Sequence, residues 1–189
     1  MGKIILSMMI TADGFIAGVN NELDWVTWED EMDRDASELI ESVDTMLVGY
    51  GAYKDMVGYW PAALTKPNSE SEGAFAKLIN DKPKVVISRS EEPLIWKNDE
   101  LLVAADLAQQ IATLKEAKGD IVFYGGASLA QSMVASDVVD EYRLYVSPIA
   151  LGKGKALFSE VSTPVKLKPT LTKVYDSGAM LLHFKADRS

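Results

Sequence analysis

The sequence contains no cysteine and only one histidine, and each shortage removes a class of chemistry. Without cysteine the chain can form neither disulfides nor thiolate metal sites, and it has no thiol nucleophile. Zinc sites usually draw on histidine and cysteine together. We therefore predict that the chain holds no metal ion.

Basic residues are scarce as well, with 19 lysines and arginines against 28 acidic residues and a net charge of −9. A chain of this charge repels nucleic-acid phosphates and anionic lipid, and no run of basic residues supplies a local patch. No apolar run approaches the roughly 18 residues of a membrane span. The first strand-like segment leads straight into residues 11–14 without a cleavage-type tail, so no signal peptide is expected. These observations predict a cytoplasmic protein that binds neither nucleic acid nor membranes.

The length of 189 residues and the 48% content of hydrophobic residues predict one domain, residues 1–189, with a sizeable core. Short apolar segments bounded by glycine, proline, aspartate or serine alternate with helix-like segments, which favours a largely parallel sheet with right-handed crossovers. The strand-like segments are 3–10, 44–49, 84–88, 101–104, 120–125, 141–148, 165–174 and 179–185. The helix-like segments are a first helix after a capping box at 27–30, then 71–80, 107–117 and 127–135. Residues 176–178 predict a C-terminal hairpin, and the polar segment 61–73 predicts a mobile loop.

A glycine pair follows the strand-like segment that ends at Tyr124, and a helix-like segment begins directly after Gly125 and Gly126. Backbone N–H groups at such a turn can approach a phosphate closely, and the helix N-terminus adds positive potential. The same residues approach the pattern of a nucleophile elbow, in which Ser128, a later aspartate and His183 would form a hydrolase triad. The turn therefore leaves two alternatives, a phosphate site or a serine hydrolase.

Acidic residues cluster around Trp25 and Trp28 at the start of the first predicted helix. Most of them are expected to form a solvated helix face that suits the helix dipole. A carboxylate that instead points inward beside a tryptophan would have a raised pKa and could bind a polar heterocycle. Three loops follow other strand-like segments and offer further ligand contacts: 11–18, 49–53 and 88–90.

Taken in order, these motifs resemble the reductase domain at the C-terminus of the bifunctional riboflavin-biosynthesis protein RibD, within the dihydrofolate reductase-like superfamily. The resemblance covers nearly the whole chain. It is carried by residues 11–17, 25–27, 48–49, 86–89, 125–129, 139–142, 148, 151–154 and 157–158.

The resemblance implies an α/β fold of three αβα layers with a mixed, mostly parallel sheet. It implies hydride transfer from NADPH to a small heterocycle, as in 5-amino-6-(5-phosphoribosylamino)uracil reductase. The cofactor-binding residues that it implies are Met9, Ile16, Ala17, Gly49, Tyr50, Ser88, Arg89, Gly125, Gly126, Ala127, Ser128 and Leu129. The substrate-binding residues that it implies are Ser7, Asp13, Trp25, Thr27 and Tyr124.

Dihydrofolate reductases carry a catalytic acid five residues after a loop tryptophan, and the same count from Trp25 lands on Asp30. Family members commonly pair, so we expect a homodimer whose surface comes from the apolar segments 142–149 and 165–174.

The chain departs from the family pattern in two ways. The superfamily often places arginine and threonine on the cofactor phosphates, where this sequence has Tyr50 and Ala52. A weaker preference for NADPH over NADH is therefore expected. The deaminase half of RibD is absent, and so deamination is not expected of this chain. A nucleotide-binding module without turnover stays open as a further alternative.

Overall fold

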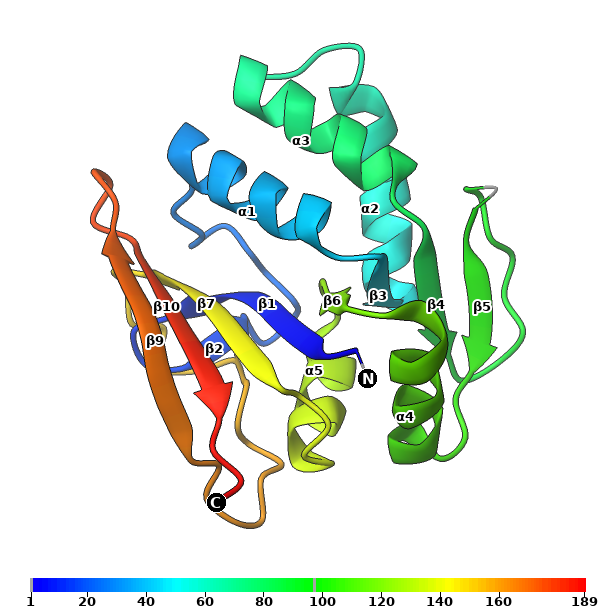
Figure 1. The fold of residues 1–189 in the computed structure, drawn as a ribbon. Helices are drawn as coiled ribbons and strands as arrows, with labels where there is room; N and C mark the ends of the chain where they lie inside the picture. Colours follow the sequence, from blue (N-terminus) through cyan, green and yellow to red (C-terminus); the bar gives the residue numbers. More distant parts are fainter. Residues whose placement is uncertain (1, 97) are drawn as a thin grey trace.

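A computed structural model describes residues 2–96 and 98–189. Its centre is an eight-stranded sheet (Figure 1). The strand order is β5-β4-β3-β6-β1-β7-β10-β9. The strands are β1 (Ile4–Thr11), β3 (Thr45–Gly49), β4 (Lys84–Ser88), β5 (Glu100–Val103), β6 (Ile121–Phe123), β7 (Glu141–Ser147), β9 (Leu167–Val174) and β10 (Met180–Ala186). Pairing is parallel from β5 through β7 and antiparallel from β7 through β10 to β9. The predicted mixed sheet with an antiparallel C-terminal hairpin is thus confirmed.

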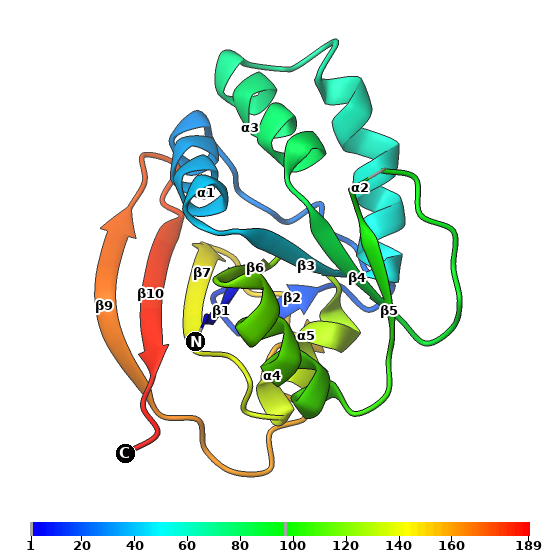
Figure 2. The same ribbon diagram turned by 45° about the vertical axis from the view of Figure 1, so that its right-hand side comes forward.

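Helices cover both faces of the sheet, which gives the three layers expected from the resemblance (Figures 1 and 2). One face carries α1 (Asp30–Ser42), α2 (Tyr50–Ala63) and α3 (Glu70–Asp81), whose apolar residues pack on β3 and β4. The other face carries α4 (Leu107–Lys118) and α5 (Ala127–Ala135), which pack on β1, β6 and β7. The buried strands are apolar on both faces because each face has its own helical layer.

A two-stranded ribbon, β2 (Phe15–Ala17) with β8 (Lys155–Ala156), lies beside the main sheet and was not expected from the sequence. Its strands are only three and two residues long, too short to show a period-two pattern. Strand β7 lies between β1 and β10, so in the segment 142–149 only residues after Ser147, such as the exposed Ile149, are free to contribute to the expected dimer surface.

Helix α2 is the largest difference from the sequence prediction. It contains Gly51, Gly58 and Pro61, all poor helix formers, so local propensity argues against it. Burial of Tyr53 and Met56 against the sheet stabilises it instead. The predicted loop 61–73 is wrong for most of its length, because α2 and α3 together leave only residues 64–69 between them.

The predicted capping box at 27–30 is also wrong. Helix α1 begins at Asp30, and its N-cap residue Glu29 makes no side-chain capping bond. The backbone N–H of Thr27 donates to the hydroxyl of Ser147 at 3.0 Å and ties the segment before α1 to the end of β7. Among the described residues, no helix is both long and apolar enough to cross a membrane.

Candidate functional site

A cavity of about 430 Å³ lies above the carboxyl ends of the central strands, on the face that carries α1 to α3. Met9 of β1 and Tyr124, directly after β6, contribute from the sheet, and the other lining residues come from the start of α1, the end of α2 and the start of α3. The cavity is lined by Met9, Val26, Trp28, Glu29, Asp30, Asp33, Tyr59, Trp60, Asn68, Ser69, Glu72, Phe75 and Tyr124. Ligands of open α/β sheets bind at this edge, outside the carboxyl ends of the strands.

Asp33 is the buried carboxylate of this cavity, with 6% of its surface exposed. The indole Nε1 of Trp28 donates to one carboxylate oxygen at 2.8 Å, and the Ser71 hydroxyl donates to the other at 3.3 Å. Burial raises the pKa of Asp33, and the nearby charges of Asp30 and Glu72 raise it further, against these two hydrogen bonds. A carboxyl group of this kind can hold a proton closer to neutral pH than an exposed one.

Asp30, the residue predicted to be catalytic, also lines the cavity, but it is exposed at the first position of α1. The geometry therefore favours Asp33 as the proton-holding group, and a catalytic role for Asp30 stays a prediction. The sequence contains a signal for this choice. The spacing of five residues from a tryptophan, counted from Trp28 instead of Trp25, lands on Asp33.

Of the five residues predicted to bind substrate, only Tyr124 lines the cavity. Ser7 is buried within β1, and the indole of Trp25 donates to the carbonyl of Glu22 in its own turn. Thr27 holds the chain before α1, as described above. Substrate contacts by these residues stay predictions.

Asp13 fastens two loops to each other. Its carboxylate accepts hydrogen bonds from the backbone N–H groups of Leu151 and Gly152, at 3.1 and 2.7 Å, and from the Thr11 hydroxyl at 2.6 Å. The bond from Thr11, then that from Gly152, hold the pKa of Asp13 below its ordinary value. The carboxylate is thus occupied in positioning the loop after β1.

The ends of β3 and β6 meet at three glycines beside the cavity. The N–H of Gly49 donates to the carbonyl of Gly125 at 3.4 Å. Gly125 and Gly126 have φ angles of 98° and 101°, which side-chain-bearing residues rarely adopt. A Cβ at Gly125 would also lie 3.1 Å from the Cβ of Ala52 in the first turn of α2. These φ angles and this close approach favour glycine at both positions, so neither residue places a side chain of its own over the backbone.

Helices α2 and α5 begin at this edge with free N-termini. Their N-cap residues Gly49 and Gly126 make no side-chain capping bond, and neither first turn contains an acidic residue. By contrast, Ser69 caps α3 and Asp106 caps α4 through their side chains. Two neighbouring helix N-termini with unfilled N–H groups favour an anion such as a phosphate.

The other residues predicted to bind a cofactor lie in two places, at the carboxyl ends of the central strands and in β2. Met9 lines the cavity, Leu129 packs against Gly49, and Tyr50 opens α2 with its hydroxyl 3.5 Å from the carbonyl of Pro93. Ser88 is the buried last residue of β4 and the exposed Arg89 follows it, while Ala127 and Ser128 begin α5 after β6. Ile16 and Ala17 are buried and belong to β2, with Ile16 in the core against the α5 side of the sheet. Cofactor contacts by these residues are not tested by the structure.

The structure separates the two residues of the hydrolase alternative. His183 lies on β10 opposite Arg143 and contacts the Glu141 carboxylate at 3.1 Å, on the face covered by α1. Ser128 belongs to α5, which covers the opposite face. A triad of Ser128 and His183 is therefore wrong for this fold.

Comparisons with known proteins agree with this architecture. The family model of the RibD C-terminal domain matches residues 2–181. The chain is 34% identical to the uncharacterized protein YyaP of Bacillus subtilis (strain 168) over 179 residues, which is 94% of this chain and 92% of YyaP.

Two solved structures have the same fold. A putative riboflavin biosynthesis protein from Shewanella sp. PV-4 aligns over 100% of both chains with a TM-score of 0.75 and 21% identity. Dihydrofolate reductase from Enterococcus faecalis, complexed with NADP(H) and RAB-propyl, aligns with a TM-score of 0.61 and 12% identity, over 98% of this chain and 97% of the enzyme. With the family match over nearly its whole length, the chain belongs to the RibD C-terminal domain family.

Proposed function

We propose that this protein is an NADPH-dependent reductase of a small heterocyclic substrate, related to the reductases of riboflavin biosynthesis. One observation carries the proposal. A backbone edge formed by Gly49, Gly125 and Gly126 (the glycine edge), with the free N-termini of α2 and α5, adjoins a cavity that contains the buried carboxyl group of Asp33, whose pKa burial raises. The two adjoin because Tyr124 of the cavity lining directly precedes Gly125. The family match supports the proposal, and so does the shared fold of the Enterococcus faecalis dihydrofolate reductase, which is complexed with NADP(H).

The residues of the glycine edge fit the phosphates of a dinucleotide. Gly49, Gly125 and Gly126 carry no side chain that would keep a diphosphate from the backbone, and the N–H groups that open α2 and α5 are available as donors. The bound cofactor supplies a hydride. Met9 and Tyr124 line the cavity from the sheet, where their side chains would exclude water from the substrate.

Asp33 supplies the proton that a reduction by hydride transfer also needs. Adding a hydride to the carbon of a C=N bond leaves a negative charge on nitrogen, and a proton must reach that nitrogen. The raised pKa of Asp33 keeps its carboxyl group partly protonated at a higher pH than that of a solvated aspartate. Trp28 and Ser71 fix the direction in which the group points.

The experiment follows loss of absorbance of reduced nicotinamide while pyrimidine, pterin and flavin compounds are offered, with the riboflavin-pathway pyrimidine among them. Once a substrate is found, Asp33→Asn is expected to lower turnover by roughly 10²–10⁴-fold, the usual worth of a general acid. Asp30→Asn, a matched change at the exposed neighbour, is expected to have a far smaller effect. Equal losses in both variants would contradict the role of Asp33.

Cofactor binding is tested at Gly126. Gly126→Ala forces a side chain onto a φ of 101° and should abolish most of the fluorescence change on NADPH titration. Gly58→Ala is the control, because a Cβ at exposed Gly58 in α2 meets nothing within 4 Å. Circular dichroism shows that each variant is folded. Unchanged NADPH affinity in folded Gly126→Ala would place the cofactor elsewhere.

We also propose a homodimer that pairs through β9. This strand is a sheet edge, and Leu171 and Val174 are 48% and 67% exposed on it. Long exposed edges that carry apolar side chains tend to pair with another strand. Light scattering on the wild type and on Val174→Glu tests the proposal, which predicts a dimer mass for the first and a monomer mass for the second.

A further inference from the structure

The cavity proposed as the substrate site has a wall of one charge. Besides the proposed acid Asp33, three carboxylates line it, those of Glu29, Asp30 and Glu72. Within the described part of the chain, no lysine, arginine or histidine is among its lining residues. Such a wall repels an anionic ligand and favours one that is neutral or positive.

Glu72 is held in its charged form at the start of α3. The Tyr59 hydroxyl and the backbone N–H of Asn68 donate to its carboxylate, and so does the Asn68 side-chain amide at 3.1 Å. Partial burial opposes ionisation, but these hydrogen bonds outweigh it and lower the pKa of Glu72. All three donors are neutral groups, so the negative charge at the cavity is not cancelled by its partners.

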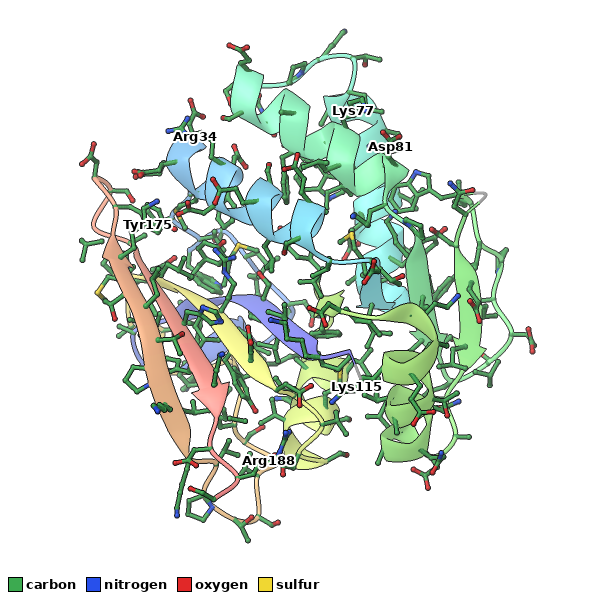
Figure 3. The ribbon with its side chains drawn as sticks, in the orientation of Figure 1. Arg34, Lys77, Asp81, Lys115, Tyr175 and Arg188 are labelled. Atoms are coloured by element: carbon green, nitrogen blue, oxygen red, sulfur yellow. The ribbon has the colours of Figure 1, made fainter. Side chains whose placement is uncertain are left out.

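Glu29 carries a second fixed charge. The backbone N–H of Ser177 donates to it at 2.9 Å, and hydrogen bonds from Ser177 hold its pKa below the ordinary value. Arg34 acts on Glu29 only through its longer-range charge. It is an exposed residue near the N-terminal end of α1 and is not part of the cavity lining (Figure 3).

Lys173, on the C-terminal hairpin near α1, forms its ion pairs outside the cavity. Lys173 pairs with Glu31 at 3.0 Å and with Asp35 at 2.6 Å. Tyr175, beside the hairpin turn in Figure 3, donates to the same Asp35 carboxylate at 2.6 Å. This base therefore neutralises the outer side of α1 and leaves the cavity negative.

Five aromatic residues also line the cavity: Trp28, Tyr59, Trp60, Phe75 and Tyr124. Trp60 and Phe75 meet edge to face with centroids 5.1 Å apart, and Phe75 contacts Tyr124 at 6.1 Å. Aromatic surfaces bind planar rings, and they attract a ring that carries positive charge more strongly. This is an observation independent of the carboxylates, and it points to the same kind of ligand.

We propose that the substrate is a planar nitrogen heterocycle without negative charge, neutral or protonated, and without a phosphate group. The inference rests on the proposed function only in taking this cavity as the substrate site. It sets this protein apart from reductases of phosphorylated ribosylamino-pyrimidines, whose substrate would bring a dianion to a negative wall.

The test measures binding to the full chain by isothermal titration calorimetry with excess NADP⁺ present, which fills the proposed phosphate site and supplies no hydride. Two matched pairs serve as probes: 2,4-diaminopyrimidine against orotate, and cytidine against cytidine 5′-monophosphate. We expect the first member of each pair to bind roughly tenfold or more tightly than the second, with a gap that narrows in added salt.

Glu72→Gln is expected to reduce the affinity ratio between the two members of each probe pair by about 1.5–5-fold. This is the contribution of one partly exposed charge pair. Glu70→Gln removes the same charge from the same helical turn at an exposed residue outside the cavity lining, and it should leave the gap unchanged.

Equal or tighter binding of orotate or the nucleotide overturns the inference, and so does failure of 2,4-diaminopyrimidine to bind. The two proposals fail separately. Charge-selective binding without any oxidation of NADPH refutes the reductase and supports the present inference. Turnover of a phosphorylated pyrimidine supports the reductase and refutes the present inference.

Discussion

Replacement of Asp33 by asparagine is expected to stabilise the fold at neutral and alkaline pH while it removes activity. Burial, the largest influence, raises the pKa of Asp33 above the ordinary 3.8. A carboxyl group whose pKa is higher in the folded chain favours folding only while it is protonated. That contribution is complete below the pKa of the unfolded chain and is lost as the pH rises through the pKa of the folded chain.

The asparagine variant does not titrate at this position, so its stability relative to the wild type should rise over that interval and then stay constant. Each unit by which the pKa is raised corresponds to about 1.36 kcal/mol. In a chain of this size each 1 kcal/mol shifts Tm by about 2–4 °C. The variant keeps an oxygen that accepts from the Trp28 indole and an amide that can donate to Ser71, so little packing is lost.

The assay is urea unfolding followed by tryptophan fluorescence, at constant ionic strength, from about pH 3.5 to pH 8. Asp30→Asn is the control. It loses a favourable charge at the N-terminus of α1 and should destabilise the fold by about 0.3–1 kcal/mol, opposite in sign to the change at Asp33. If the difference in the free energy of unfolding between Asp33→Asn and wild type does not grow with pH, ionisation of Asp33 costs the folded chain nothing. Asp33 then cannot be the proton-holding group.

Two further changes test other parts of the molecule. Tyr50→Arg at the start of α2 should increase NADPH affinity over NADH by roughly 10- to 100-fold, because charge-assisted bonds to phosphate are worth about 1.5–3 kcal/mol, and titrations at two salt concentrations check this. Lys84→Met should destabilise the fold by about 3–5 kcal/mol in urea unfolding, because it leaves the buried Asp99 carboxylate without the ammonium group 3.9 Å away. Adding Asp99→Asn to the same chain should restore part of the lost stability.

Much of the sheet is predictable because the central strands are short apolar segments with clear boundaries. The glycine edge is predictable for a related reason, since a strand that ends in two glycines before a helix demands φ angles that only glycine adopts readily. Helix α2 is not predictable in this way. Its glycines and proline give no helical signal, and contacts distant in sequence, such as Asn80 bonding the carbonyl of Trp60 at 3.0 Å, stabilise it.

The sequence predicted an inward-pointing carboxylate in the acidic cluster, but it did not decide between Asp30 and Asp33. The sequence indicated that one carboxylate beside a tryptophan would point inward, but several candidates lay within one helical turn. Asp33 stands three and seven residues before Ala36 and Ile40, both buried, so it shares the buried face of α1. That periodicity was available in the sequence, and it holds whether the helix begins at the predicted capping box or at Asp30.

The helix termini assign opposite electrostatic roles to the two halves of the site. Each helix presents a partial positive charge at its N-terminus. In α1 the chain's own acidic side chains balance this charge, because Asp30, Glu31 and Asp33 occupy the first turn. In α2 and α5 it supplies no acidic residue and no side-chain cap, so the charge is left for a ligand. A dinucleotide placed with its phosphates against α1 would face carboxylates, whereas against α2 and α5 it meets free N–H groups. For the proposed reductase, backbone and side-chain charge together therefore fix which end of the cofactor meets the substrate cavity.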